Sequence, residues 1–193
     1  PLPPAHPPKS VLGRIIAILD AVKEAGGCAS IMDIAGRTSL PKSTVSRLGG
    51  ELTAQRYLAR AEDGVVLGLR LFELGSRASL PRRLITAAAP VIRSLHDATG
   101  ERLVLWIQQG DDMVSIAVAA GRLPMLPTRA GARSPALTTA SGKAYLAFCP
   151  DERVVSRISA PLERDAATSF HDELMNVRAA VVATDIEASY PGI

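Results

Sequence analysis

The sequence predicts an α+β protein in which a small helical unit is followed by an α/β unit. Apolar residues recur at helical spacing through the N-terminal part, and two short strand-like runs then flank a turn. Longer strand-like and helical runs alternate in the second half. Of the 193 residues 47% are apolar, which is enough to build cores, but only 4% are aromatic. We therefore expect aliphatic, alanine-rich cores.

The charge of the chain is unevenly distributed. Lys9 to Arg83 contain 12 Lys and Arg against 7 Asp and Glu, a net charge of +5. The chain from Leu84 onwards contains 10 against 12, a net charge of −2. A basic N-terminal part suggests a polyanion partner for that part alone, with a random scatter of surface charge as the alternative.

Cysteine use and hydropathy predict a cytoplasmic protein. Cys28 and Cys149 lie far apart, which is neither a disulfide framework nor a metal-ligand spacing, and this favours a reducing compartment. The first residues, PLPPAHPPKS, lack the order of a signal peptide. No apolar run approaches the ~18 residues that a membrane span needs, so we expect no membrane partner.

The chain should begin with a tail and a capped helix. Residues 1–8 are proline-rich and predict a disordered tail. Ser10 can cap the helix that follows, in which apolar residues recur at helical spacing from Val11 to Val22. The Gly26–Gly27 pair should end that helix.

Two further helices and a hairpin should follow. Ser30 and Asp33 resemble a capping box and predict a short helix from Ile31 to about Thr38. Pro41 suits the first position of a third helix, 41–54, because its missing N–H would be unpaired there. The buried stripe of this helix should be Val45, Leu48 and Leu52. YLARAEDGVVLG then gives two strand-like runs about a turn. Three helices and a hairpin over residues 9–68 predict a winged helix-turn-helix.

The rest of the chain predicts a linker and an α/β unit. Residues 69–80 should form a linker helix, and Pro81 should break it before residues 81–193. A long helix from about Arg82 to Ala98 should be stopped by Gly100. RLVLWIQQ and MVSIAVAA should pair through GDD, and 121–135 should be a loop. The last predicted helices are TASGKAYLAF, Glu152 to Ile158, and His171 to Val182.

The third helix has the composition of a DNA-recognition helix. A recognition helix enters the major groove with its N-terminal end against the bases, so short polar side chains and cations should gather there. Arg47 could bridge a guanine edge and Lys42 could neutralise a phosphate. Arg60, at the start of the hairpin, suits a wing contact. The predicted DNA-binding residues are Lys42, Ser43, Thr44, Ser46, Arg47 and Arg60. The alternative is the solvated face of an ordinary surface helix.

Four segments resemble the IclR family of bacterial transcriptional regulators. SLPKSTVSRL is similar to the family's GLPKSTVHRLL-type segment, and VLGLRLFELG resembles its wing end and linker helix. TGERLVLWIQQGDDMV resembles the start of its effector-binding domain, and PALTTASGKAYLAF its segment ending in GKAxLA. The resemblance runs from about Lys9 to Ile193. It implies a winged helix, a linker helix used in dimerisation, and a GAF-like α/β domain that binds a small effector.

The resemblance also implies partners and effector-binding residues. Family members bind double-stranded DNA operators as homodimers or dimers of dimers, and their effectors are mostly small carboxylates or aromatic acids. Ala140 and Ser141 match positions whose backbone N–H groups meet an effector carboxylate, and Asp185 matches an acidic position near the pocket. Trp106 and Leu126 could line that pocket. Ordinary core and surface packing is the alternative for these residues.

The sequence departs from the family pattern at several places, one of which is the sharper interruption of the linker region at Pro81. Gly49 and Gly50 replace a leucine and another good helix former, which predicts a soft recognition helix. This leaves open an alternative function, a small-molecule-sensing or dimerisation module with a degenerate DNA-binding helix. Arg56 stands where the family often has glycine, so we expect a different turn into the wing. EASYPGI resembles a segment that normally continues into further strands, so we expect an effector domain lacking its last strands.

No enzyme motif is complete. SGK at 141–143 lacks the glycine and the hydroxyl residue of a phosphate-binding loop, because Leu137 and Ala144 stand at those positions. It is also one residue short of a Ser-x-x-Lys pair. The three histidines have no metal-ligand spacing, and Asp111–Asp112 falls in a predicted turn. We expect no enzymatic activity and no cofactor.

Overall fold

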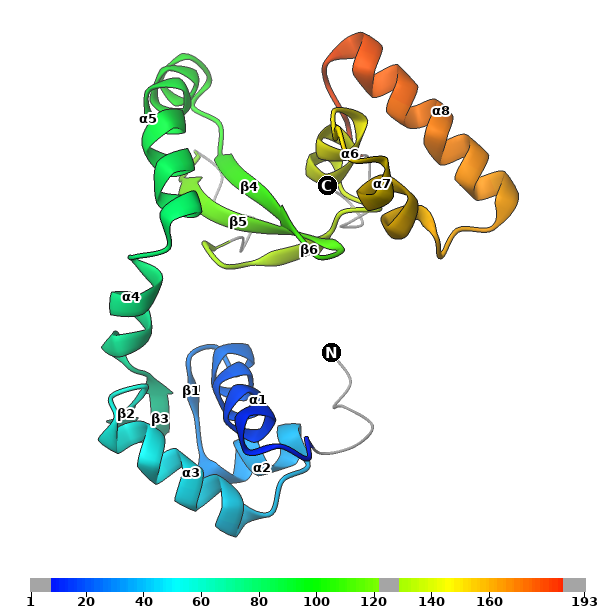
Figure 1. Ribbon diagram of the computed structural model, residues 1–193. Helices are drawn as coiled ribbons and strands as arrows, with labels where there is room; N and C mark the ends of the chain where they lie inside the picture. Colours follow the sequence, from blue (N-terminus) through cyan, green and yellow to red (C-terminus); the bar gives the residue numbers. More distant parts are fainter. Residues whose placement is uncertain (1–7, 122–128, 186–193) are drawn as a thin grey trace. The chain divides into compact units, whose positions relative to one another are not determined.

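The computed structural model describes residues 8–121 and 129–185 (Figure 1). The chain divides into two compact units, Pro1–Ala78 and Ser79–Ile193, which we call the N-terminal and C-terminal units. Each has its own cluster of buried apolar residues. Residues 1–7 of the predicted tail lie outside the described residues. No helix within the described parts is long and apolar enough to cross a membrane.

The N-terminal unit contains the three predicted helices, and local capping fixes where two of them begin. Its helices are α1 Val11–Glu24, α2 Ile31–Thr38, α3 Lys42–Ala54 and α4 Leu69–Gly75. The Ser10 hydroxyl accepts the N–H of Gly13 at 3.0 Å. Ser30 and Asp33 form the predicted capping box in both directions. Hydrogen bonds from the hydroxyl and the backbone N–H of Ser30 hold the pKa of the Asp33 carboxyl below its usual range.

A three-stranded antiparallel sheet completes the N-terminal unit. Its strands are β1 Cys28–Ala29, β2 Leu58–Ala61 and β3 Gly64–Leu67, in the order β1-β3-β2. The hairpin β2–β3 was predicted, but the two-residue strand β1 was not. Gly64 has φ +152°, and a Cβ there would collide with the backbone carbonyl of Ala29. Glycine is therefore required at the hairpin tip, where β1 passes closest.

The core of the N-terminal unit is aliphatic, as its composition predicts. Val45, Leu48 and Leu52 form the inner stripe of α3. They pack in one cluster with Ile18, Ala21, Val22, Ala29, Ile34, Leu40 and Leu58. Close packing of these residues fixes α3 against α1, α2 and the sheet, and leaves the opposite face of α3 in solvent.

The break between the two units lies earlier than predicted. Helix α4 ends at Gly75 and α5, Ser79–Thr99, begins before Pro81. Pro81 occupies the first turn of α5, where its missing N–H would have no intrahelical partner, so it does not break the helix. Pro90 lies inside α5 and removes the bond that its N–H would give to the carbonyl of Thr86.

The C-terminal unit is built on a second antiparallel sheet. Its strands are β4 Leu103–Gln109, β5 Asp112–Ala119 and β6 Arg133–Pro135, in the order β4-β5-β6. The pairing of β4 with β5 is interrupted between Leu105 and Trp106. Strand β6 lies in the segment 121–135 that was predicted to be a loop. The Ser115 hydroxyl donates to the carbonyl of Arg129 at 2.6 Å and fastens the chain leading into β6.

Helices α5 and α6, Ala140–Ala147, contact this sheet, and α8, Arg164–Ala180, packs against α6. Helix α7, Glu152–Ser159, lies between α6 and α8 in the sequence. Residues of β5, of the segment after β6 and of α6, α7 and α8 form one buried cluster: Met113, Ala136, Leu146, Ala147, Ile158, Phe170, Leu174 and Val177. The predicted start of α8 at His171 is wrong by seven residues, because RDAATS forms a polar first part of the helix that has no apolar periodicity.

Candidate nucleic-acid interface

Helix α3 presents a polar, cationic outer face above its buried stripe. Lys42, Ser43, Ser46 and Arg47 are all exposed, and Thr44 is half-buried. Pro41 is the N-cap residue of α3 and not, as predicted, its first helical residue. Its carbonyl accepts the N–H groups of Thr44 and Val45. The N–H groups of Lys42 and Ser43 therefore lie in the first turn, where a helix offers no internal acceptor. The start of α3 can donate to an anion.

Arg47 pairs with Glu51, which is not among the predicted DNA-binding residues. Its guanidinium donates to the Glu51 carboxylate at 2.8 Å, one helical turn further on. Both side chains are 61% exposed, so solvent screens the pair and its contribution to stability is small. The signal was present in the i,i+4 spacing of an arginine and a glutamate on one helix. The pair orients Arg47 on the outer face of α3.

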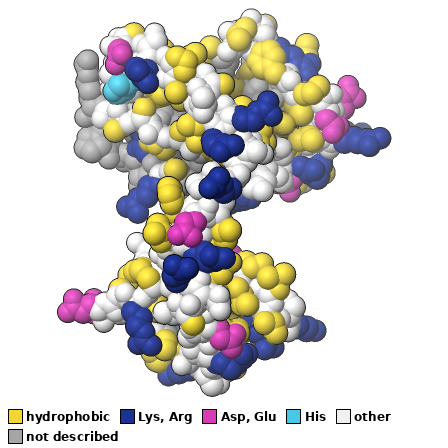
Figure 2. All heavy atoms as spheres, turned by 60° about the vertical axis from the view of Figure 1, so that its left-hand side comes forward, with side chains coloured by type: hydrophobic (Ala, Val, Ile, Leu, Met, Phe, Trp, Pro, Cys, Tyr) yellow, Lys and Arg dark blue, Asp and Glu magenta, His cyan; other side chains and the backbone are white. Residues whose placement is uncertain are grey.

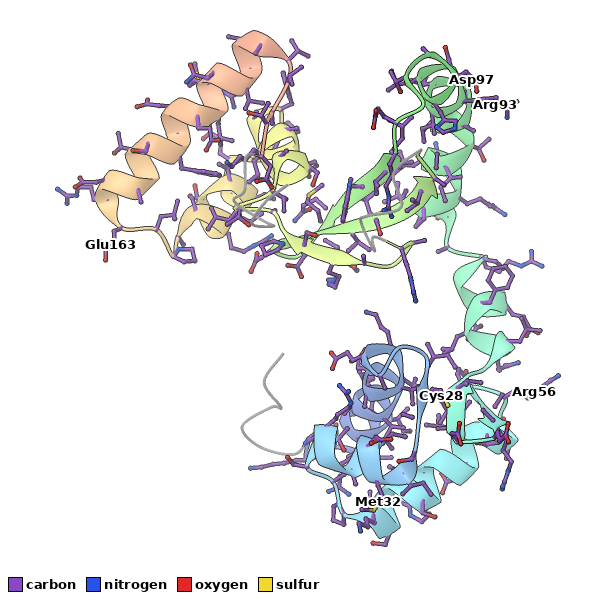
Figure 3. The ribbon with its side chains drawn as sticks, turned by 180° about the vertical axis from the view of Figure 1, so that it is seen from behind. Cys28, Met32, Arg56, Arg93, Asp97 and Glu163 are labelled. Carbon is purple, nitrogen blue, oxygen red and sulfur yellow. The ribbon has the colours of Figure 1, made fainter. Side chains whose placement is uncertain are left out.

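Two more arginines follow α3, Arg56 in the turn into the hairpin and Arg60 on its first strand. Arg56 has φ +63°, the left-handed conformation that favours glycine. The turn therefore keeps a backbone conformation suited to glycine, and the expected difference in its backbone is not found. Its exposed side chain points away from the unit (Figure 3). Arg60 lies on β2, paired with Val65 of β3, and is exposed. On the face drawn in Figure 2, Lys and Arg side chains are interspersed with hydrophobic ones.

Gly49 and Gly50 do not interrupt α3. The helix runs without a break to Ala54, and the Thr53 hydroxyl donates to the Gly49 carbonyl at 2.8 Å. A Cβ at either glycine would meet no atom within 4 Å. The open space belongs to a hollow of about 240 Å³ between α2, α3 and the β2–β3 hairpin, which we call the α3–hairpin hollow. Arg60 and Ser46 both line it.

The predicted effector-binding residues lie in the C-terminal unit, with one exception. Ala140 and Ser141 occupy the first turn of α6, whose N-cap Thr139 accepts the N–H of Gly142 at 3.3 Å. Trp106 of β4 is half-buried and packs against the core cluster that includes α6. Asp185 is half-buried and lies beyond the end of α8. Leu126 lies outside the described residues.

The SGK segment has structural partners. A Cβ at Gly142 would collide with the backbone of Ala136, so glycine permits the close approach of α6 to the segment after β6. Lys143 is 13% exposed and pairs with the Glu173 carboxylate of α8 at 2.7 Å. This ion pair joins α6 to α8. Within the described residues, no group of three or more His, Cys, Asp or Glu could hold a metal ion.

A helix-turn-helix with a β-hairpin, followed by a separate α/β unit, is the architecture of a transcriptional regulator with a DNA-binding domain and a second domain. Family models for both domains match. The IclR helix-turn-helix domain matches residues 11–62, and the C-terminal domain of the bacterial transcriptional regulator IclR matches residues 79–193. The chain belongs to the IclR family of bacterial transcriptional regulators.

Individual relatives agree with this assignment. The HTH-type transcriptional repressor AllR of Salmonella paratyphi A is 29% identical over 176 residues, which cover 88% of this chain and 64% of AllR. An IclR homolog of Microbacterium hydrocarbonoxydans, solved with 4-hydroxybenzoate, superposes with a TM-score of 0.78 at 26% identity over 89% of this chain and 75% of that one. The Thermotoga maritima IclR gives 0.66 at 26% identity over 92% and 76%. The chain thus spans somewhat less than two thirds of the length of AllR.

Proposed function

We propose that this chain is a sequence-specific DNA-binding regulator that reads a duplex with the outer face of α3. The observation that carries the proposal is the division of α3 into a buried stripe and an exposed polar face. Arg47 would contact a base edge in the major groove, and Lys42 a phosphate. Short hydroxyl side chains lie between Lys42 and Arg47 in the sequence of α3, those of Ser43, Thr44 and Ser46. Contact with chromosomal DNA would place the protein in the cytoplasm.

The start of α3 and strand β2 would supply the contacts to the DNA phosphates. The free N–H groups at the start of α3 suit one phosphate, and the exposed Arg60 of β2 suits another. The continuity of α3 through Gly49 and Gly50 supports this function over a degenerate recognition helix. The two functions differ in salt dependence. A DNA reader should lose affinity steeply as salt rises, whereas a pure ligand module should have no duplex affinity.

A small carboxylate is the effector class that we propose for the C-terminal unit. The N–H groups of Ala140 and Ser141 at the start of α6 can meet a carboxylate, because neither has an acceptor within its own helix. The Microbacterium hydrocarbonoxydans relative was solved with 4-hydroxybenzoate, an aromatic acid, and this supports the same class here. Trp106, Asp185 and Leu126 are proposed to surround the ligand.

A homodimer is the proposed assembly, with pairing of dimers as a further step. Helix α4 exposes Leu69, Phe72 and Leu74, and Phe72 is 72% exposed. Apolar side chains at this density on one short helix are suited to burial against a second copy. Light scattering of the chain should give twice the monomer mass, and Phe72→Glu should shift that mass towards the monomer.

Selection from randomised duplexes at near-physiological salt tests the function directly. We expect enrichment of a repeated or palindromic half-site. Arg47→Ala should then cost about 1–3 kcal/mol on the selected duplex and relax the preference at one position. Lys42→Ala should weaken all duplexes equally and lower the salt slope by about one. Arg153→Ala, an exposed arginine of the C-terminal unit, is the control. No enrichment by folded protein would refute the proposal.

A further inference from the structure

The α3–hairpin hollow has an apolar floor, two hydroxyl residues in its walls, Ser46 and Thr53, and a single charged lining residue. Ile34 and Val45, each 1% exposed, form its floor, and Ile31 stands beside them. Gly49 and Gly50 leave the wall on the α3 side without side chains. The carbonyl of Gly49 already accepts the Thr53 hydroxyl. A water molecule needs two to four polar partners, and the side chains of this floor offer none, so the floor favours the apolar part of an occupant.

Arg60 gives the hollow its charge. It lines the hollow from β2, is exposed, and forms no ion pair within the described parts of the chain. No acidic residue is among the described residues that line the hollow. Glu62 and Asp63 lie nearby in the hairpin turn, but both are exposed to solvent and neither lines the hollow. An apolar space beside an unpaired guanidinium complements a ligand with an apolar body and one anionic group.

The volume limits the size of this ligand. At about 240 Å³ the hollow is smaller than the ~300–1,000 Å³ of pockets that take drug-sized molecules. A single ring or a short branched chain is the size that remains. Larger side chains at positions 49 and 50 would fill this space, so the site depends on the glycine pair.

We propose that the α3–hairpin hollow binds a small carboxylate with an apolar body, in addition to any ligand of the C-terminal unit. The carboxylate of the ligand pairs with the guanidinium of Arg60, and the apolar body of the ligand covers Ser46 from the side of the hollow. Both residues are proposed DNA contacts, so the ligand competes with the duplex. This last step rests on the proposed function, whereas the binding site does not.

Benzoate is a suitable probe, and benzamide is its uncharged match. In amide-resolved NMR of the full chain, benzoate should shift the Gly49 and Gly50 signals saturably at concentrations up to about 10 mM, tenfold above a millimolar Kd. Benzamide should bind at least about tenfold more weakly, because it lacks the charge that pairs with Arg60. Arg60→Gln should weaken benzoate by a similar factor. Gly49→Leu should abolish the shifts.

Gly36→Leu is the matched control for the cavity variant. Gly36 is a helical glycine of α2 with open space around it, but it does not line the hollow, so benzoate binding should be unchanged. If the Gly49→Leu chain does not fold, Arg60→Gln decides, since its side chain is exposed. Unchanged Gly49 and Gly50 signals, or equal binding by wild type and Arg60→Gln, would overturn the site.

DNA competition is measured separately by fluorescence anisotropy with a selected duplex. Benzoate should lower the duplex affinity of wild type more than that of Gly49→Leu, because a response of the C-terminal unit is common to both chains. Equal responses would overturn the competition. If no duplex binds at all, the proposed function fails, while the glycine signals still decide whether the hollow binds benzoate.

Discussion

Replacing Gly50 by alanine should stabilise the N-terminal unit by a measurable amount. Gly50 lies inside α3, is exposed, has no positive φ, and a Cβ there would meet no atom within 4 Å. The gain is therefore that of helix propensity alone, about 0.5–1 kcal/mol. A domain of 60–100 residues gains about 4–8 °C in Tm per kcal/mol, so the expected rise is roughly 2–8 °C. Gly36→Ala in α2 should act alike.

The assay separates the two units by their chromophores. Trp106 is the single tryptophan and lies in the C-terminal unit, so its fluorescence reports that unit alone. Far-ultraviolet circular dichroism follows both units, and the transition without a fluorescence counterpart belongs to the N-terminal unit. Gly26→Ala is the opposite control. Gly26 has φ +82°, so alanine should lower the same Tm. A fall, or no change, with Gly50→Ala would show that α3 is not a regular helix at this position.

Three further predictions concern the same unit. Glu51→Gln should tighten duplex binding about twofold, because Arg47 no longer has to leave an ion pair worth about 0.3–0.5 kcal/mol. Weaker binding in a titration would mean that Glu51 itself contacts the duplex. Asp33→Ala should lower the unfolding midpoint at neutral pH. The pKa of the Asp33 carboxyl is lower in the folded state, so its stabilising contribution is present above about pH 4 and is lost as the pH falls through the folded value. The unfolding midpoints of the wild type and of Asp33→Ala should therefore converge in acid. A difference between these midpoints that does not change with pH would exclude the carboxylate as its source. Arg56→Gly should stabilise the unit by about 1 kcal/mol in urea unfolding, because arginine is strained at φ +63°; a loss would indicate that its side chain packs.

Local chemistry made much of the N-terminal unit predictable. The caps at Ser10 and Ser30 are determined within three residues of chain, and the structure has both. The buried stripe of α3 follows from helical spacing alone, and it lies where expected. The exposed residues of α3 were predicted by the same spacing. Their contact with DNA is a separate matter, which remains a prediction.

The missed elements are those that depend on distant parts of the chain. Strand β1 has two residues and exists because β3 pairs with it, which no periodicity can indicate. Strand β6 likewise depends on pairing with β5. The sequence predicts a break at Pro81, but the effect of this proline depends on its position within the first turn of α5. The hollow beside Gly49 could not be predicted either, because α2 and the hairpin, distant in sequence from Gly49, supply the rest of its lining.

The inner face of α3 is under selection for folding, whereas its outer face is open to selection for binding. Its inner side chains hold the fold together, while those on its outer side take no part in the aliphatic core. Substitutions on the outer side are therefore close to neutral for folding. If the outer face reads DNA as proposed, descendants of such a protein can change which duplex they prefer, one residue at a time, without passing through unstable intermediates. On that reading, folding stability does not limit how far the DNA targets of duplicated copies can diverge.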